Sequence, residues 1–246
     1  MIVCLLTQNI IQNEEKENSK MIINYAGKVA RENQSALLLT PELSLQGFPD
    51  KLEQPVKPIN VKSIEEIRKA ASHYGLSIGF GYFEQLDEDT YNTYTIINSK
   101  GKRIVMQRKR KTFKFAKEDR FIKMGTVTND FIFADMYTRI VICYGLRFPQ
   151  LFSAESKHPH LYIVPANWPK ARILHWEVLL KARAIENQAW VIGVNRTGGI
   201  YNGHSMVITP NGDVTAKSNE GLLSFPIERE TVLTIRKEFP FNEVIG

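Results

Sequence analysis

The chain contains the segment Arg139-Ile-Val-Ile-Cys-Tyr-Gly-Leu-Arg-Phe-Pro-Gln-Leu-Phe152, which predicts a buried strand, a sharp turn and a helix in that order. Three consecutive β-branched residues at 140–142 favour the strand. Gly145 allows a tight backbone turn, and Pro149 suits the first turn of a helix. Cys143 therefore stands where helix N–H groups and the positive end of the helix dipole would favour the thiolate, the nucleophilic form of cysteine. We expect the chemistry of the protein at this residue.

Predicted strands and helices alternate along the whole chain. Strands are expected at 2–7, 36–40, 77–83, 91–98, 103–107, 131–133, 139–142, 161–164, 190–194, 205–209, 214–216 and 222–226, and helices at 16–32, 64–74, 173–188 and after Cys143 to about residue 155. The turn Ser99-Lys-Gly101 predicts a hairpin, which argues against an all-parallel sheet. Because no linker interrupts residues 1–246, we expect a single domain. The pattern predicts an α/β fold with two mixed sheets packed face to face and covered by helices, a four-layer α-β-β-α sandwich.

The composition is that of an ordinary globular protein, since 43% of the 246 residues are hydrophobic and 24% are charged. No run of 18 apolar residues occurs, so no membrane-spanning helix is expected. Cys4 and Cys143 are too few for a disulfide framework and favour a reducing, cytoplasmic setting. Neither these cysteines nor His175 and His204 have partners at metal-ligand spacing, so we expect no metal and no other cofactor.

The net charge of +6 is concentrated between Lys102 and Lys123, a segment with ten basic residues and two acidic ones. Such a segment can bind nucleic acid, and the three phenylalanines within it, at 113, 115 and 121, could stack on bases. The same residues could instead form a solvated face or a rim that attracts anionic substrates, with the aromatic rings packed on the core. We favour the second interpretation, so nucleic acid is not an expected partner.

Four polar residues stand at or just after predicted strand ends, namely Glu42, Lys109, Glu118 and Cys143. Each alone has a simpler explanation: a carboxylate after a strand is often a cap, a lysine is often a rim charge, and a buried cysteine is often inert. Together they supply a nucleophile, a proton carrier and a cation, which are the groups that amide hydrolysis needs.

Five segments around these residues resemble the carbon–nitrogen hydrolase (nitrilase) superfamily. They are Leu39-Thr-Pro-Glu42-Leu-Ser-Leu-Gln-Gly47-Phe-Pro49, Ile142-Cys143-Tyr144-Gly-Leu-Arg147-Phe148-Pro149, Ala166-Asn167-Trp168-Pro169, His175-Trp176-Glu-Val-Leu-Leu-Lys-Ala-Arg183-Ala-Ile-Glu186-Asn187-Gln188 and Gly203-His-Ser205-Met-Val-Ile-Thr-Pro210-Asn-Gly212. Ala166-Asn-Trp-Pro169 and the ending Arg236-Lys-Glu-Phe-Pro240 are most similar to the ω-amidase branch. The resemblance implies hydrolysis of the terminal amide of ω-amides of dicarboxylic acids, such as 2-oxoglutaramate.

The resemblance assigns the family's Glu–Lys–Cys triad to Glu42, Lys109 and Cys143. Cys143 would attack the amide carbonyl and form a thioester, while Glu42 would carry the proton. Lys109, with the backbone N–H of Tyr144, would face the developing oxyanion. Glu118 would be the second glutamate, which holds the lysine and helps to orient the substrate amide. A lysine between two carboxylates should stay charged.

Further expectations concern the pocket and the assembly. Asn167 and Trp168 are expected to line the pocket, and the resemblance implies a homodimer with the helix after the nucleophile at its interface. Lys111 shares strand parity with Lys109 and is the alternative lysine, although Lys109 fits the family spacing. Arg147 could bind a substrate carboxylate or pin the turn after the nucleophile, and we favour the second role.

Two departures from the family pattern bear on the substrate. Gly145 stands where the family commonly has Asp, which removes a potential helix cap worth about 1 kcal/mol but no triad member. The stretch 195–203 is short for the ω-amidase branch, and loops there help to shape the pocket. The alternatives are a hydrolase of another short amide, an N-carbamoyl compound or a nitrile, and a relative that binds a ligand or nucleic acid without turnover. The intact triad favours an enzyme.

Overall fold

The computed structural model describes residues 1–32, 36–49, 52–153 and 158–240. Its strands are β1 (Ile2–Thr7), β2 (Leu37–Leu39), β3 (Ser77–Leu86), β4 (Asp89–Ile97), β5 (Arg103–Arg108), β6 (Phe131–Phe133), β7 (Met136–Ile140), β8 (Leu161–Ala166), β9 (Trp190–Asn195), β10 (Thr197–Gly198), β11 (Tyr201–Asn202), β12 (Ser205–Ile208), β13 (Val214–Ser218) and β14 (Gly221–Pro226). Its helices are α1 (Glu15–Glu32), α2 (Val61–Tyr74), α3 (Ile173–Asn187) and α4 (Arg229–Glu238), with short 3-10 helices η1 (Lys114–Ala116), η2 (Glu118–Arg120), η3 (Cys143–Arg147), η4 (Pro149–Leu151) and η5 (Lys170–Arg172).

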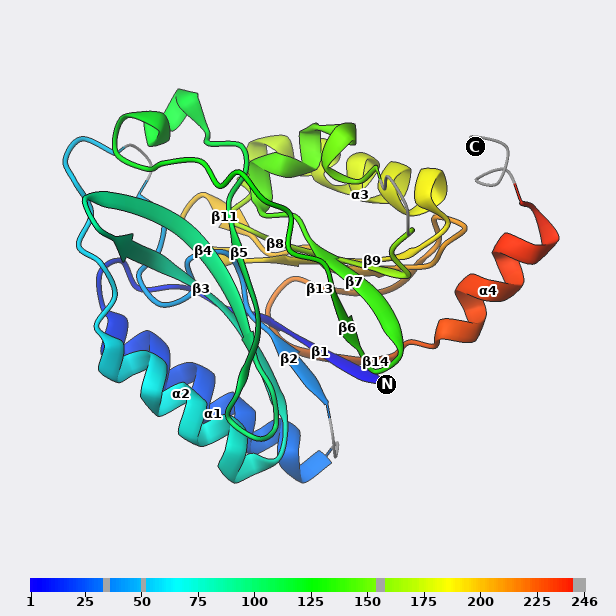
Figure 1. Cartoon of the computed structure of the whole chain (residues 1–246), viewed down its shortest axis with the longest axis horizontal. Coiled ribbons are helices and arrows are strands. Elements are labelled where there is room, and N and C mark those ends of the chain that lie inside the picture. The colour runs from blue at the N-terminus through cyan, green and yellow to red at the C-terminus, as the bar shows by residue number, and fades with distance from the viewer. Residues whose placement is uncertain (33–35, 50–51, 154–157, 241–246) are drawn as a thin grey trace.

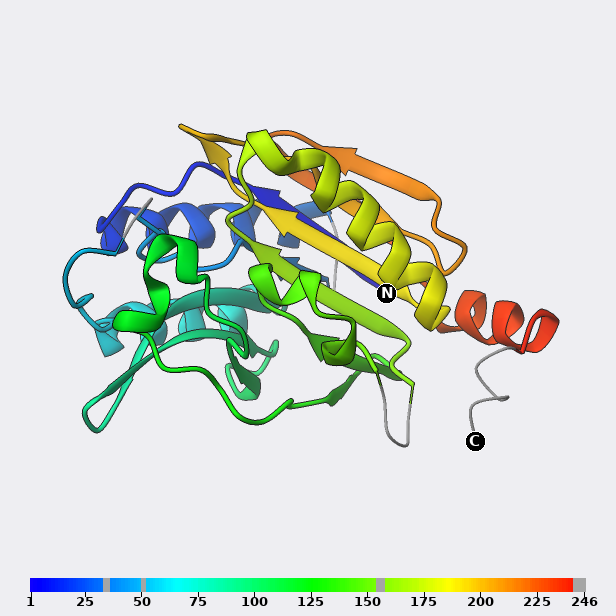
Figure 2. The ribbon, with the colours of Figure 1, turned by 90° about the horizontal axis from the view of Figure 1, so that it is seen from above.

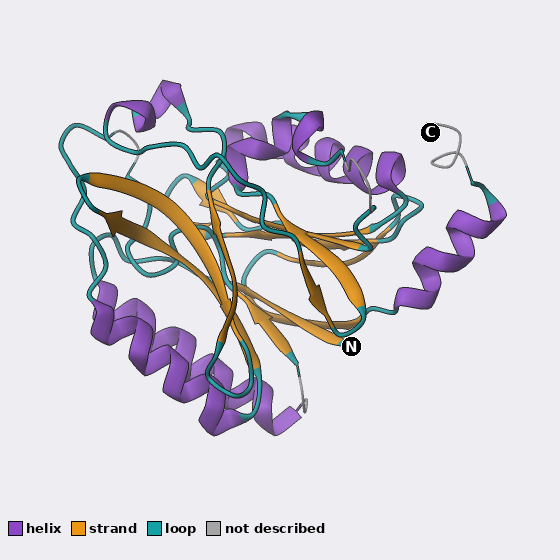
Figure 3. Cartoon of the chain, viewed as in Figure 1, coloured by secondary structure: helices purple, strands orange, loops and turns teal. Residues whose placement is uncertain are grey.

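Two six-stranded mixed sheets pack face to face (Figure 1). The first has the order β14-β1-β2-β3-β4-β5 and the second the order β13-β12-β9-β8-β7-β6, while β10 and β11 form a separate small hairpin. Helices α1 and α2 cover the outer face of the first sheet, and α3 covers that of the second (Figure 3). The predicted four-layer α-β-β-α arrangement is therefore confirmed. Seen from above, α4 extends beyond the end of the sandwich (Figure 2).

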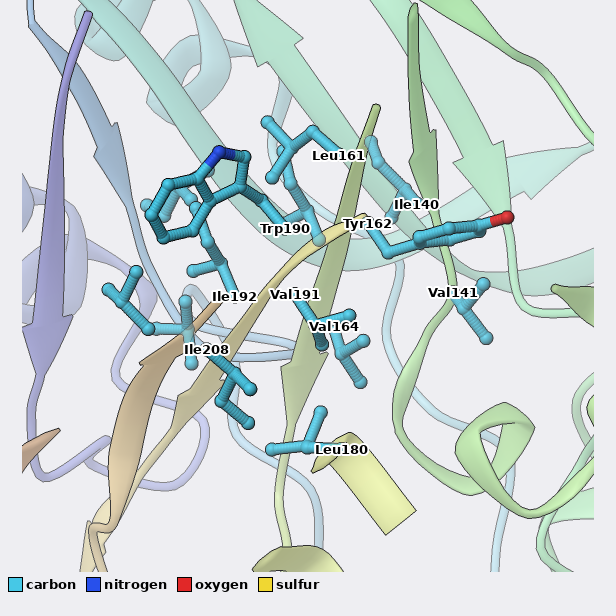
Figure 4. Close-up of a cluster of buried hydrophobic side chains, with 14 of the residues drawn as sticks. Ile140, Val141, Leu161, Tyr162, Val164, Leu180, Trp190, Val191, Ile192 and Ile208 are labelled. Carbon is cyan, nitrogen blue, oxygen red and sulfur yellow. The ribbon is translucent and has the colours of Figure 1, made fainter. Parts of the chain in front are cut away.

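The alternation of side chains in β1 shows how the layers are joined. Val3 and Leu5 belong to the core between the sheets, whereas Cys4 and Leu6 belong to the cluster beneath α1 and α2. Figure 4 shows part of the larger cluster, which includes side chains of β7, β8, β9 and β12. Each fully buried aliphatic side chain contributes about 1.5–3 kcal/mol, so the burial of β1 on both faces stabilises the packing of the layers.

The segment after Cys143 differs from the prediction. Strand β7 ends at Ile140, and the chain then forms the two 3-10 helices η3 and η4 instead of one α-helix. Phe148, between them, has an extended backbone with φ −115° and ψ 98°, the conformation that a following proline favours. Pro149 also lacks the N–H that would continue a helix through this point. Residues 154–155 of the predicted helix lie outside the described residues.

Two other helices depart from expectation. Helix α2 begins three residues early because the side chain of Asn60 accepts a hydrogen bond from the Lys62 N–H and caps the helix. Helix α4 was not predicted, and Val232 is its buried residue. No helix within the described ranges is long and apolar enough to cross a lipid bilayer.

Strand ends bring the candidate residues to one edge of the sandwich. Glu42 follows the end of β2 by three residues, and Lys109 directly follows β5. Cys143 follows β7 by three residues, and Asn167 directly follows β8. Strands β1, β2 and β3 are mutually parallel, as are β7, β8 and β9, and functional groups collect at the carboxyl ends of such strands.

Candidate active site

Cys143 occupies a strained turn after β7. Its φ of +44° lies in the left-handed region, which non-glycine residues rarely adopt and which costs on the order of 1–3 kcal/mol. The Gly145 N–H donates to the Ile142 carbonyl at 3.0 Å, and the Arg183 guanidinium donates to the Leu146 carbonyl at 3.1 and 3.2 Å. These hydrogen bonds hold the turn, so that the nearly buried cysteine faces a cavity.

Glu42 is presented by a turn that follows β2. The Thr40 carbonyl in this turn accepts a hydrogen bond from the Tyr94 hydroxyl at 2.9 Å. Gly81 of β3 packs directly against the same turn, because a Cβ atom there would lie 2.4 Å from the backbone nitrogen of Leu43. Only glycine therefore lets the sheet approach closely enough to bury the Glu42 side chain.

Lys109 has a buried ammonium group that lies between two carboxylates. Its Nζ is 2.8 Å from Glu42 Oε1 and 2.9 and 2.8 Å from the two Glu118 oxygens. All three side chains are at most 1% exposed. Lys111, the alternative lysine, instead lies 5.1 Å from the ring centroid of Phe148. The structure therefore brings Lys109, and not Lys111, to the two glutamates.

Two asparagines complete the polar network. The Asn92 side-chain amide donates to Glu42 Oε1 at 2.8 Å and to Glu118 Oε1 at 3.1 Å. Asn167 donates to Glu42 Oε2 from its backbone N and from Nδ2, both at 3.0 Å. The Asn167 carbonyl oxygen lies 3.9 Å from Cys143 Sγ. The Glu42 carboxylate is thus held by both asparagines as well as by the lysine, and it sits beside the sulfur.

Electrostatics keep the carboxylate and the ammonium ionised. Burial opposes the charge on Glu42, but the Lys109 charge and hydrogen bonds from Lys109 and Asn167 outweigh it and lower the Glu42 pKa. Burial likewise opposes the charge on Lys109, and the charges of Glu118 and Glu42 outweigh it and raise the Lys109 pKa. The expectation that this lysine stays charged is confirmed.

The expectation of a resting thiolate is wrong. Burial raises the pKa of Cys143 well above its usual value, the charge of Glu42 raises it further, and Lys109 offsets only part of this. The 3-10 helix η3 aligns few N–H groups compared with the α-helix that was expected, so its dipole is small. The raised pKa and the hydrogen bond between the sulfur and the Glu42 carboxylate favour the thiol form of Cys143.

A cavity of about 670 Å³ opens onto this network. The residues predicted from the sequence that line it are Glu42, Lys109, Cys143, Tyr144, Asn167 and Trp168. Glu118 lies behind the lysine, and its oxygens accept hydrogen bonds from Lys109 and from the Phe113 N–H. Glu118 is therefore placed to hold the lysine, and its expected part in orienting a substrate amide stays a prediction.

Two arginines also line the cavity. The Arg147 guanidinium lies over the Trp168 ring, 4.7 Å from its centroid, and the Arg172 guanidinium lies 5.8 Å from the centroid of Phe113. Neither forms an ion pair with a carboxylate among the described residues. Burial and the positive charge of Arg172 lower the Arg147 pKa. The Arg147 guanidinium also lies 3.3 Å from His175 Nδ1, whereas the hydrogen bonds to the turn described above come from Arg183. The structural role expected for Arg147 stays a prediction.

Sequence reasoning missed three functional contacts. Asn92 lies within β4, where no local motif marks it. Arg172 comes three residues after the Asn-Trp-Pro motif, and that proximity was its only signal. The hydrogen bonds from Arg183 to the Leu146 carbonyl join segments that are distant in the sequence, so no local pattern indicates them. The expectation that the stretch 195–203 shapes the pocket is confirmed, because Ile200 and Tyr201 line the cavity.

Comparison with known proteins identifies the family. A family model described as carbon-nitrogen hydrolase matches residues 3–236. The chain belongs to the carbon–nitrogen hydrolase family. It is 31% identical over 243 residues to a hydrolase in the agr operon of Staphylococcus aureus, covering 94% of this chain and 92% of that protein. It is 29% identical over 218 residues to the 2-oxoglutaramate amidase of Bacillus subtilis (strain 168), covering 85% of this chain and 84% of that protein.

The solved structures support the fold of this carbon–nitrogen hydrolase. The carbon-nitrogen hydrolase of Helicobacter pylori G27 superposes with a TM-score of 0.89 at 17% identity, covering 99% of this chain and 94% of that one. The family resemblance and its ω-amidase branch, inferred from the sequence motifs, are confirmed by the family model and the similarity to a 2-oxoglutaramate amidase. Within the described ranges, no group of three His, Cys, Asp or Glu side chains could hold a metal ion.

Proposed function

We propose that this carbon–nitrogen hydrolase removes the terminal amide of a small ω-amide acid, with 2-oxoglutaramate as the leading substrate, through a thioester on Cys143. One observation carries the proposal: a thiol, a carboxylate, an ammonium and two guanidinium groups that have no carboxylate partner among the described residues meet in one cavity. The similarity to a 2-oxoglutaramate amidase supports this choice of substrate.

Acylation begins when Cys143 Sγ attacks the amide carbonyl carbon. The thiol proton passes to Glu42, whose carboxylate accepts a hydrogen bond from the thiol and has a lowered pKa. Lys109 and the backbone N–H of Tyr144 stabilise the oxyanion that forms. Glu42 then returns the proton to the departing nitrogen, the C–N bond breaks, ammonia leaves, and a thioester remains on the sulfur.

Deacylation uses the same carboxylate. Glu42 accepts a proton from water, and the water oxygen attacks the thioester carbon. The C–S bond breaks, the sulfur recovers its proton from Glu42, and the product leaves as a dicarboxylic acid. Glu118 and Asn92 act as positioning residues, because they contact Lys109 and Glu42 without lining the cavity.

The two cavity arginines support an acid-bearing substrate. A guanidinium binds a carboxylate through two parallel hydrogen bonds, and the positive charges of Arg147 and Arg172 repel each other until an anion lies between them. A simple nitrile or a neutral short amide has no carboxylate to place between the two arginines. An N-carbamoyl acid does carry a carboxylate and is the second candidate.

Ammonia release provides the test. Purified protein is incubated with 2-oxoglutaramate, the neutral amide butyramide and N-carbamoyl-β-alanine, with Cys143→Ala as the matched control. The proposal predicts turnover of 2-oxoglutaramate that exceeds turnover of butyramide by at least about tenfold and is lost in the variant. Faster turnover of N-carbamoyl-β-alanine would show that the preferred substrates are N-carbamoyl acids. Ammonia release by the Cys143→Ala variant would refute the thioester mechanism.

We also infer a homodimer in the cytoplasm. The outer face of α3 exposes Leu174, Val178 and Ile185 by 70%, 55% and 50%, and a row of exposed apolar side chains favours burial against a second copy. Sedimentation at micromolar concentration should give the mass of two chains, and the mass of one chain would contradict the inference. Both cysteines are free thiols, which supports a reducing compartment.

Small anions, and not nucleic acids, remain the proposed partners of the basic segment. Part of its charge is already engaged, because Arg108 pairs with Glu84 at 2.8 Å and Lys123 pairs with Asp89 at 2.5 Å. Lys109 is buried in the active site. Salt-dependent binding of DNA or RNA at micromolar concentration would contradict this proposal.

A further inference from the structure

The active-site cavity is much larger than the leading substrate needs. A water molecule occupies about 30 Å³ in the liquid, so about 670 Å³ corresponds to more than twenty waters. A five-carbon ω-amide acid, with roughly ten non-hydrogen atoms, displaces about half of that volume or less. Cavities of this size ordinarily take drug-sized ligands. The cavity therefore has room for a longer substrate.

Part of the cavity wall is apolar and exposed. Phe115 is 78% exposed and Ile200 is 49% exposed, although both line the cavity. Large apolar side chains that gather at the edge of a pocket mark a binding surface more often than chance exposure. These two residues, with Phe113 and Ala171, form what we term the apolar mouth.

The apolar mouth is held by backbone hydrogen bonds. The Ile200 carbonyl accepts a hydrogen bond from the Lys170 N–H at 2.9 Å, which joins the β10–β11 hairpin to the 3-10 helix η5. On the other side, the Ala116 carbonyl accepts a hydrogen bond from the Leu52 N–H at 3.0 Å and anchors η1, the helix that carries Phe115. The mouth therefore presents a formed surface.

The anion site adjoins the apolar mouth. The Arg172 guanidinium lies 5.8 Å from the Phe113 ring centroid, and the Phe113 ring lies 5.9 Å from the Phe115 ring. A substrate carboxylate held by the arginines thus lies next to aromatic side chains. Phe115 and Ile200 line the same cavity, so a substituent on the carbon that bears this carboxylate has apolar side chains to contact within it.

We propose that the apolar mouth is a substrate subsite for an aryl or alkyl group attached near the carboxylate, so that the preferred substrates are N-acylated ω-amide amino acids longer than 2-oxoglutaramate. The inference rests on the proposed amidase activity. The reaction is unchanged: the side-chain amide gains water and loses ammonia, while the N-acyl bond stays intact. The acyl group supplies binding energy at the mouth.

Initial rates of ammonia release test the subsite. The substrates are glutaramate, N-acetylglutamine and N-benzoylglutamine, which share the cleaved amide and the acid. The wild type should show kcat/KM for the benzoyl compound higher than for the acetyl compound by about tenfold or more, the scale at which filling an apolar pocket changes this ratio. Phe115→Ala and Ile200→Ala should lose most of this gain. Val61→Ala, an equally exposed apolar site on α2, should keep it.

The outcomes separate the two proposals. If glutaramate releases ammonia but the benzoyl compound is no better than the acetyl compound, the subsite is refuted and the amidase proposal stands. If the benzoyl preference exists but both mouth variants retain it, the subsite lies elsewhere and the inference is wrong. If Phe115→Ala changes the sedimentation coefficient and not the selectivity, the mouth is a contact between chains. Absence of ammonia from every amide would overturn both proposals.

Discussion

Replacing the buried lysine should destabilise the protein strongly at neutral pH. Lys109→Met keeps the approximate volume but removes the cation that neutralises Glu42 and Glu118, whose side chains are 1% and 0% exposed. Removing one partner of a buried ion pair costs about 3–5 kcal/mol, because the remaining charge is uncompensated. Here two carboxylates lose their cation, although both retain the Asn92 amide as a donor. We expect a loss of about 4 kcal/mol.

The loss should shrink as the pH falls. In the wild type folding lowers the Glu42 pKa, so its contribution to stability is present above its unfolded pKa of about 4.3 and is lost as the pH falls through the folded value. Without the cation, burial and the second carboxylate would raise the Glu42 pKa instead. The folded Lys109→Met variant would then take up a proton between pH 7 and pH 5 and recover on the order of 1 kcal/mol or more relative to the wild type.

Urea unfolding at pH 7 and pH 5 measures both effects, with fluorescence of the three buried tryptophans as the signal. Lys111→Met is the matched control, since Lys111 stands two residues along the chain and packs on the Phe148 ring. It should change the free energy of unfolding by less than about 0.5 kcal/mol. A cost below about 1 kcal/mol for Lys109→Met, or a cost equal at both pH values, would show that Lys109 does not neutralise the two buried carboxylates.

Three further variants probe separate parts of the site. Asn92→Ala removes an N–H donor from the Glu42 carboxylate. The Glu42 pKa should rise, so the acidic limb of the pH profile of kcat/KM should move to higher pH. A lower rate with an unchanged acidic limb would show that Asn92 has only a structural role. Arg147→Met should raise KM for 2-oxoglutaramate by about 10-fold or more while sparing neutral amides, and an equal effect on both classes would remove the arginine from substrate binding. Gly81→Ala places a methyl group 2.4 Å from the Leu43 nitrogen and should lower the free energy of unfolding by about 1–3 kcal/mol, whereas an unchanged urea midpoint would show that the turn tolerates displacement.

The site residues that could be predicted from the sequence are those that stand in short local motifs. Glu42, Cys143 and Asn167 each stand next to a strand end in a short characteristic segment, and the structure places all three at one cavity. The alternation of strands and helices was enough to predict the sandwich. Asn92 and Arg172 carry no such local mark, because their role depends on which segments the two sheets bring together.

The errors have physical causes that a sequence does not display. Pro149 appeared to begin an α-helix, but the extended backbone that it favours at Phe148 divides the segment into two 3-10 helices. Cys143 appeared to gain a thiolate from that helix, yet burial and the Glu42 charge raise its pKa. Desolvation depends on the whole packed environment of the sulfur.

The most direct test of the account is the detection of the acyl-enzyme by mass spectrometry. Protein is mixed with 2-oxoglutaramate, quenched in acid within the first turnovers, digested and mapped. A thioester on Cys143 predicts a peptide containing this residue that is heavier by the mass of the substrate minus that of ammonia, and this adduct should be absent in Cys143→Ala. Ammonia release without any adduct on this cysteine, or an adduct on another residue, would contradict the central claim.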